Sequence, residues 1–170
     1  LKNKKNAGYT LLELMIVVAI IAIIASVPLP KLMSARLAAN ESAAISTLRS
    51  IASAQAQLQS ASAIDCDSDG AGEYGYLADL AGVANLRIDD GTGAATLTGG
   101  TPLTPSVLSA AFGNVQVGVA GEGVVTRSGY VFQLFLPDDA NAGLAEATTG
   151  GGGATLPDEN SAEILWAAYA

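Results

Sequence analysis

The 170-residue sequence contains no histidine and a single cysteine, Cys66. Without histidine, the chain cannot form a Ser-His-Asp triad, a Cys-His nucleophile pair or a histidine-ligated zinc site by itself. One cysteine cannot form an intrachain disulfide. Basic residues are also scarce, since eight Lys and Arg stand against sixteen Asp and Glu, for a net charge of −8. A chain with no basic patch to neutralise phosphates is not expected to bind nucleic acid, and we predict that it is not an enzyme.

The few basic charges are unevenly distributed. Lys2, Lys4 and Lys5 open the chain, and Glu13 is the single charged residue from 9 to 30. From Lys31 onward, five basic residues stand against fifteen acidic ones. A short basic start, an apolar run and a long acidic remainder are typical of a membrane-inserted chain whose basic end stays cytoplasmic.

The apolar run is short but continuous. Residues 14–25, LMIVVAIIAIIA, are all apolar, and the span from 11 to 27 is interrupted only by Glu13 and Ser26. A helix over 11–27 is about 25 Å long, at the short end of what crosses a bilayer. An ordinary secretory signal peptide is the alternative. Two features argue against a signal peptide. Glu13 lies at the front of the apolar run, and the run does not end in a clear cleavage site, since residues 25–28 resemble one only weakly.

Glu13 is the most informative residue of this segment. An ionised carboxylate at bilayer depth costs several kcal/mol, so it indicates a function. A cut after Gly8 would create a positively charged amine on Tyr9, four residues before Glu13, that could pair with it within one chain or between two chains. Alternatively, Glu13 lies at the headgroup level. The charges alone leave both readings open.

Residues 5–16, KNAGYTLLELMI, resemble the class III prepilin signal of bacterial type IV pilins and type II secretion pseudopilins. Gly8, Thr10, Leu11 and Glu13 stand in the expected register, while Tyr9 replaces the usual Phe. The resemblance implies that 1–8 is a leader peptide, that prepilin peptidase cleaves between Gly8 and Tyr9, and that Tyr9 is then N-methylated. It further implies that Glu13 pairs with the Tyr9 amine of an adjacent subunit during assembly.

The same resemblance implies an α+β, type IV pilin-like fold, in which a long N-terminal helix packs on a small antiparallel sheet. The expected function is that of a structural subunit of a type IV pilus-like extracellular filament. The alternatives are a major pseudopilin of a periplasmic type II secretion pseudopilus and a pilin-anchored calcium-dependent adhesin. The expected partners are identical subunits in a helical homopolymer, prepilin peptidase, the inner-membrane assembly machinery and, before assembly, the membrane itself.

We expect four segments: the leader 1–8, a transmembrane or filament-core helix over 9–30, an amphipathic helical half over 31–62 and a β-rich globular domain over 63–170. Pro28 and Pro30 predict a helix break, with an extended stretch near 24–30 or, alternatively, a simple kink. Apolar spacing in the amphipathic half predicts a stripe that packs on the sheet, made of Leu37, Ile45, Leu48, Ile51 or Ala52, Gln55 and Leu58.

Strand signals in the globular domain are strongest near its middle. We predict strands over 86–89, 94–97, 115–119, 123–126 and 130–136, a short helix over 76–81, and a strand or helix over 159–170. Residues 138–160, rich in glycine, predict a flexible surface loop. Trp166 is expected to anchor the core or a subunit interface. Leu1 in place of Met indicates a non-AUG start codon or a missing first residue, and a missing C-terminal piece stays open.

Acidic residues follow the predicted long helix. Asp65, Asp67, Asp69 and Gly70 form a D-x-D-x-D-G pattern, which presents oxygen ligands to calcium, and Glu73 adds a fourth carboxylate. The pattern is partial, because a complete calcium loop has an acid where Tyr76 stands. A solvated acidic turn is the alternative. Apart from this calcium hypothesis we expect no cofactor. Cys66 is expected to be a small packed residue with a raised thiol pKa, with an intermolecular disulfide or attachment point as the second interpretation.

Overall fold

The computed structural model describes residues 8–26, 28–92 and 95–170, and the side chains among them except those of 28–30. Two helices form the N-terminal part, α1 (Leu11–Ser26) and α2 (Pro28–Ser60). The chain divides into two compact units, one up to Glu41 and one from Ser42 to Ala170. The division falls inside the predicted 31–62 segment, because the second half of α2 supplies core residues to the globular unit.

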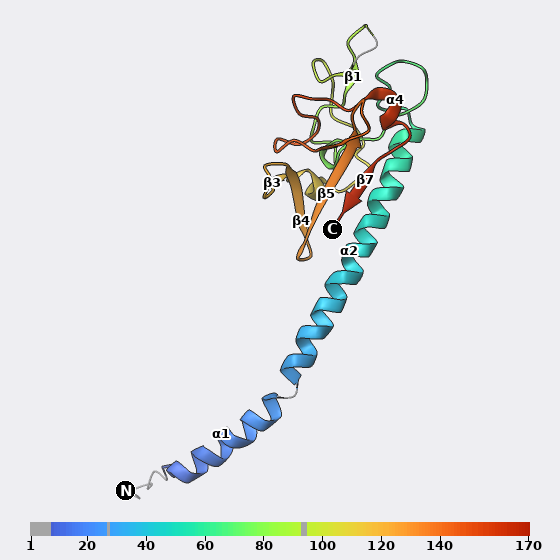
Figure 1. The fold of residues 1–170 in the computed structure, drawn as a ribbon. Coiled ribbons are helices and arrows are strands. Elements are labelled where there is room, and N and C mark those ends of the chain that lie inside the picture. The colour runs from blue at the N-terminus through green and yellow to red at the C-terminus, as the bar shows by residue number, and fades with distance from the viewer. Residues whose placement is uncertain (1–7, 27, 93–94) are drawn as a thin grey trace, which may run out of the picture. The chain divides into compact units, whose positions relative to one another are not determined.

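The remaining elements belong to the globular unit (Figure 1). In chain order they are α3 (Leu77–Leu80), β1 (Ile88–Asp89), β2 (Ala95–Thr96), a 3-10 helix η1 (Ala110–Gly113), β3 (Gln116–Val117), β4 (Gly123–Arg127), β5 (Tyr130–Pro137), β6 (Gly143–Ala145), α4 (Glu159–Ala162) and β7 (Ala167–Tyr169). Each strand predicted from the sequence is confirmed in place, most of them shorter than expected, and the 159–170 segment contains both a helical turn and a strand.

A five-stranded antiparallel sheet forms one layer of this unit. Its central strand is β5, which pairs with β4, β6 and β7 (Figure 1). Side chains of a strand alternate between its two faces, and the YVFQLFL sequence of β5 follows that period. Phe132, Leu134 and Leu136 are accordingly buried, while Val131 just before them is exposed and the residues between them are half-buried.

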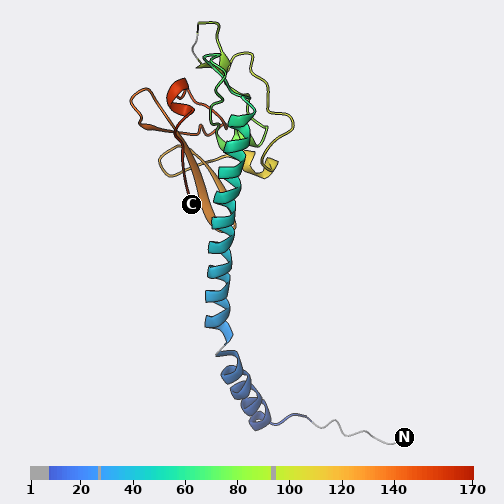
Figure 2. The ribbon, with the colours of Figure 1, turned by 90° about the vertical axis from the view of Figure 1, so that its right-hand side faces the viewer.

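The globular half of α2 forms the second layer against this sheet (Figure 2). Ala44, Ile51 and Leu58 recur every seven residues and share one buried face with Ala54. Burying an Ile or Leu side chain such as those of Ile51 and Leu58 contributes about 1.5–3 kcal/mol. Gln55 is also buried, and its side-chain amide forms two hydrogen bonds with the backbone of Gly75. Nε2 donates to the Gly75 carbonyl at 2.7 Å, and Oε1 accepts from the Gly75 N–H at 3.1 Å. These contacts confirm the α+β architecture of a helix packed on a small antiparallel sheet.

Three expectations about packing are wrong. Ile45 is 47% exposed, because it lies about 100° around the helix from Ala44, which occupies the buried face instead. Leu37, also expected in the stripe that packs on the sheet, is 65% exposed. Of the alternatives Ile51 and Ala52, Ile51 takes the core position, as one of the two predicted choices. The 138–160 segment is not simply a surface loop, because it includes β6 and buries Glu146 and Gly151.

The proline segment also differs from an extended stretch. Residues 24–26 end α1 and residues 28–30 begin α2, so the described residues around the prolines are helical. Pro28 and Pro30 both fall in the first turn of α2, where backbone N–H groups have no intrahelical acceptor and a proline removes nothing. Residue 27 lies outside the described residues, so the predicted break itself is not tested.

Candidate functional site

The segment around the predicted cleavage position is open. Gly8 and Tyr9 precede α1 without regular secondary structure, and Tyr9 is 91% exposed. A Cβ placed on Gly8 would meet no atom within 4 Å, so the chain itself does not require glycine here. A peptidase that fits a glycine on one side of the bond would find this peptide accessible.

Thr10 and Glu13 close the start of α1 as a reciprocal cap. Glu13 Oε2 accepts from the Thr10 N–H and from the Thr10 hydroxyl, both at 2.9 Å. The Glu13 N–H donates back to Thr10 Oγ1 at 3.2 Å. A Thr and a Glu three residues apart are the signature of a capping box. The spacing of Thr10 and Glu13 in the sequence thus indicates that Thr10 caps the helix, although the sequence analysis did not predict this role.

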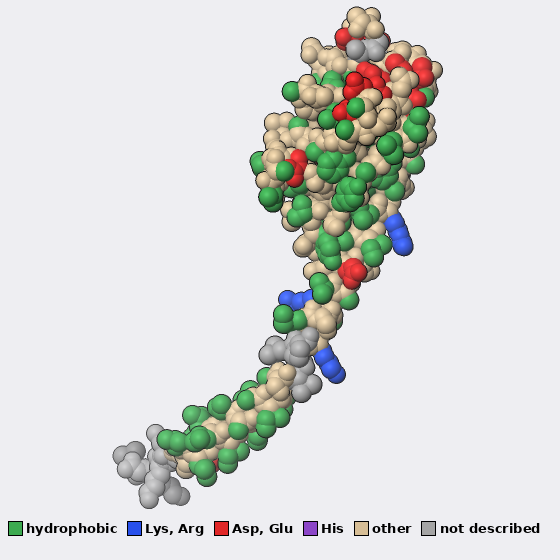
Figure 3. Space-filling view, viewed as in Figure 1, with side chains coloured by type: hydrophobic (Ala, Val, Ile, Leu, Met, Phe, Trp, Pro, Cys, Tyr) green, Lys and Arg blue, Asp and Glu red, His purple; other side chains and the backbone are tan. Residues whose placement is uncertain are grey.

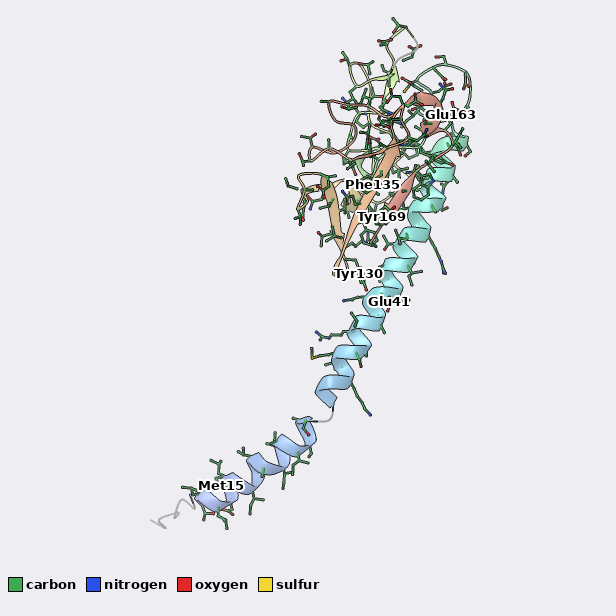
Figure 4. All side chains as sticks on the ribbon, viewed as in Figure 1. Met15, Glu41, Tyr130, Phe135, Glu163 and Tyr169 are labelled. Carbon is green, nitrogen blue, oxygen red and sulfur yellow. The ribbon has the colours of Figure 1, made fainter. Side chains whose placement is uncertain are left out.

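The helix that follows is coated with apolar side chains. Every large apolar side chain of α1 is more than half exposed, and the helix buries none (Figure 3). Met15 projects from α1 in this way (Figure 4). By length and composition, the helical stretch that begins at Leu11 is long and apolar enough to cross a membrane. The apolar character predicted for this segment thus lies on α1, whose large apolar side chains are exposed within its own unit.

The acidic residues after α2 are partly brought together. Single carboxylate oxygens of Asp65, Asp67 and Asp69 all lie within 4.8 Å of one another. The Asp69 N–H donates to Asp67 Oδ1 at 3.3 Å and the Ala71 N–H donates to Asp69 Oδ1 at 2.7 Å, so part of this oxygen set is used to form the turn. Acidic side chains gather at this end of the globular unit (Figure 3).

Glu73, expected as a fourth ligand, is engaged elsewhere. Its Oε2 pairs with Arg87 Nη2 at 3.1 Å and its Oε1 accepts from the Cys66 N–H at 2.7 Å. Both side chains of the ion pair are buried. A carboxylate that neutralises a buried guanidinium is not available to a cation at the surface, so the structure separates Glu73 from the three aspartates.

Glu163 is a residue that the sequence reading missed at this site. It follows α4, and its carbonyl accepts from Gln59 Nε2 near the end of α2 at 2.6 Å (Figure 4). Burial, together with the negative charges of Asp69 and Asp67, raises the pKa of Glu163. Nothing local in the sequence signals this proximity, because Glu163 is far from the aspartates along the chain.

Cys66 and Trp166 are both packed inside the unit. Burial raises the pKa of the Cys66 thiol to about 12, and the neighbouring Glu73 charge adds to the shift. This agrees with the prediction of a small packed residue. Trp166 is half-buried and its ring lies 6.1 Å from that of Tyr74. Nearby, the rings of Phe135 and Tyr169 join β5 and β7 edge to face at 6.0 Å (Figure 4).

Comparisons with known proteins agree with these features. Residues 3–27 match the family described as the prokaryotic N-terminal methylation motif. The chain is also 34% identical over 91 residues to the type IV major pilin protein PilA of Myxococcus xanthus, which covers 54% of this chain and 40% of that protein. The aligned part thus spans less than half of that relative's length. No solved structure matches the chain. The chain is therefore similar to a type IV major pilin over about half of its length, and it carries the prokaryotic N-terminal methylation motif ahead of a long helix packed on an antiparallel sheet.

Proposed function

We propose that this chain is a structural subunit that polymerises through α1 into a type IV pilus-like filament. The observation that carries the proposal is the uncovered apolar surface of α1, with more than half of each large side chain exposed. Such a surface is stable in lipid or against other apolar helices, and not in water. The inner membrane would hold α1 before assembly, and identical helices would cover it afterwards.

Glu13 supplies the specificity in this proposal. Both Thr10 donors reach Oε2, and Oε1 has no hydrogen-bond partner among the described residues. The carboxylate therefore keeps an open oxygen. After cleavage between Gly8 and Tyr9, the methylated Tyr9 amine of an adjacent subunit would bring the positive charge that this oxygen lacks.

The proposal assigns two further partners. Prepilin peptidase would remove residues 1–8 and methylate Tyr9, and an inner-membrane assembly machine would extract the subunit. Once α1 helices bury each other, each apolar side chain removed from water contributes about 1.5–3 kcal/mol, so the polymer would not dissociate under mild conditions. A pseudopilus that drives protein secretion would use the same chemistry.

The decisive measurement is the mass of the N-terminal peptide of the protein taken from purified filaments. A peptide that starts at Tyr9 and carries one additional methyl group is expected. A chain that keeps residues 1–8, or one cut after the apolar run, would contradict the proposal. Immunogold labelling then separates the two filament types, since a pilus labels outside the cell and a pseudopilus stays in the periplasm.

A further inference from the structure

Two carboxyl groups lie in the core of the globular unit, away from α1 and from the acidic turn. Asp79 of α3 and Glu146, directly after β6, are each only 1% exposed. Asp79 Oδ2 accepts from the Tyr76 N–H at 2.8 Å. The remaining oxygens, Asp79 Oδ1 and Glu146 Oε2, are buried and have no hydrogen-bond partner among the described residues. Buried polar atoms without a partner are rare and call for an explanation.

Glu146 joins two parts of the chain. Its Oε1 accepts from the Ala78 N–H of α3 at 2.8 Å and from the Gly151 N–H at 3.0 Å. Residues 147–153, the glycine segment, are folded back by a bond from the Ala147 N–H to the Gly151 carbonyl at 3.0 Å. One carboxyl group therefore holds the glycine segment against α3.

Gly151 brings the glycine segment close to Asp79 as well. Its φ is +73°, and a Cβ there would lie 3.0 Å from both Asp79 Oδ1 and the Ala84 Cβ. The open oxygen of Asp79 thus faces the same backbone that Glu146 holds. Both carboxyl groups thus lie close to Gly151, and the negative charge of Asp79 is near enough to raise the pKa of Glu146.

The charges around the pair do not balance. Among the described residues, Arg87 and Tyr76 are the titratable groups that interact with the pair, and Glu73 lies in the same buried region through its ion pair with Arg87. Arg87 is already paired with Glu73, and the Tyr76 hydroxyl donates to the Leu144 carbonyl at 3.1 Å. One guanidinium therefore faces three carboxyl groups, and two buried negative charges without cations are costly.

One bound proton would account for both the unpartnered oxygens and the excess negative charge. A protonated carboxyl group can donate a hydrogen bond to the open oxygen of the other one, and it carries no charge. Burial raises the pKa of Asp79 to about 6, against the lowering effects of Arg87 and the Tyr76 N–H. Burial likewise raises the pKa of Glu146 to about 7, and the Asp79 charge adds to this against the backbone N–H donors.

We propose that Asp79 and Glu146 share a proton in the folded protein, and that its loss at alkaline pH releases the glycine segment from α3. The inference is independent of filament assembly, since every residue in it belongs to the globular unit. Thr148 and Thr149, which are exposed at the tip of the segment, would then change position with the pH of the surrounding solution.

Proton linkage gives the direction in which stability changes with pH. Both acids bind protons more tightly in the folded state than in the unfolded chain, where their pKa values are about 4. The folded state therefore binds more protons than the unfolded state between about pH 4 and pH 7, and stability falls as the pH rises through this range. Above the folded values the destabilisation is complete.

The test is hydrogen exchange of the full chain in detergent micelles, read by mass spectrometry on peptides that cover 146–153, from pH 5.5 to 8.5. Exchange is normalised to an unstructured peptide of the same sequence to remove base catalysis. Wild-type protection should fall at least tenfold more across this range than in Glu146→Gln. The Gln amide keeps Oε1 for both N–H groups and donates permanently to Asp79.

Asp139→Asn, which removes a carboxylate from an exposed position, serves as the matched control and should follow the wild type. Should Glu146→Gln fail to fold, Asp79→Asn makes the same test from the other side of the pair. Protection independent of pH in the wild type would overturn the proposal. The proposal would also be overturned if adding Ca²⁺ at fixed pH raised the protection of the wild type but not of Glu146→Gln. The open oxygens would then bind a cation and not a proton.

Discussion

The two units of this chain treat their apolar residues in opposite ways. In α1 every large apolar side chain is more than half exposed, whereas Ile51, Leu134 and Leu136 of the globular unit are at most 1% exposed. The globular unit is stabilised by its own core. The apolar helix gains the same free energy only from other molecules, lipid first and identical helices later in our proposal. Hydrophobicity alone therefore does not indicate where a residue is buried.

Charges show the same contrast. Glu13 keeps one open oxygen at the exposed start of α1, whereas Glu73 is enclosed with Arg87 and both lie in the interior. An exposed carboxylate can bind a partner that arrives later. A buried one must find its partner inside the fold, or the fold loses stability.

The largest expected effect is on assembly and leaves the globular unit unchanged. Glu13→Gln keeps an oxygen for the Thr10 donors but removes the charge that would attract the Tyr9 amine. We expect filament yield, measured from sheared cells, to fall at least tenfold, with no change in the melting temperature of the full chain in detergent. Glu41→Gln, also exposed on a helix, is the control and should assemble normally. Normal filaments from Glu13→Gln would disprove the pairing.

Arg87→Met should have the opposite effect to Glu13→Gln, because it should lower the stability of the globular unit and not act directly on assembly. Removing the guanidinium leaves Glu73 buried without its cation, at a cost of about 3–5 kcal/mol. Urea unfolding followed by Trp166 fluorescence measures the loss, since Trp166 is the sole tryptophan and packs on Tyr74. Adding Glu73→Gln to Arg87→Met should recover part of it. A double variant no more stable than Arg87→Met would show that the charge imbalance is not the cause.

A pair of isoleucines on one helix sharpens the contrast between covered and uncovered positions. Ile51→Ala should destabilise the globular unit by about 2–5 kcal/mol, because it opens a cavity in the core. Ile45→Ala, at a 47% exposed position, should cost less than 1 kcal/mol. Both are read by the same urea unfolding. Equal losses would mean that Ile45 is covered in the protein in solution.

The smallest effect concerns the calcium prediction, which stays a prediction. If Asp65, Asp67 and Asp69 bind Ca²⁺, calcium at ten times its Kd should stabilise the full chain by about 1.4 kcal/mol. The measurement is the melting temperature with and without Ca²⁺. Asp67→Asn should abolish the shift, and Asp139→Asn should keep it. A shift that survives in Asp67→Asn would assign the calcium to other residues.

Much of this structure was predictable where the signal is local. The alternation in β5 placed Phe132 and Leu134 on one face, and the apolar run ahead of the prolines predicted α1. β6 gave no such signal, since Gly-Leu-Ala is too short to show a period and becomes a strand only by pairing with β5. The partners of Glu73 and Glu146 were not predictable either, because they lie at distant points of the chain.

The sequence by itself determined the features that depend on neighbours along the chain. The register from Gly8 to Glu13, the capping spacing of Thr10 and Glu13, and the length of the apolar run are of this kind. Only the tertiary structure decided that Glu73 pairs with Arg87, that Glu146 accepts from the Ala78 N–H, and that Ala44 rather than Ile45 is buried. The physical reason is that burial and charge pairing depend on which distant segments pack together, and folding brings those segments into contact.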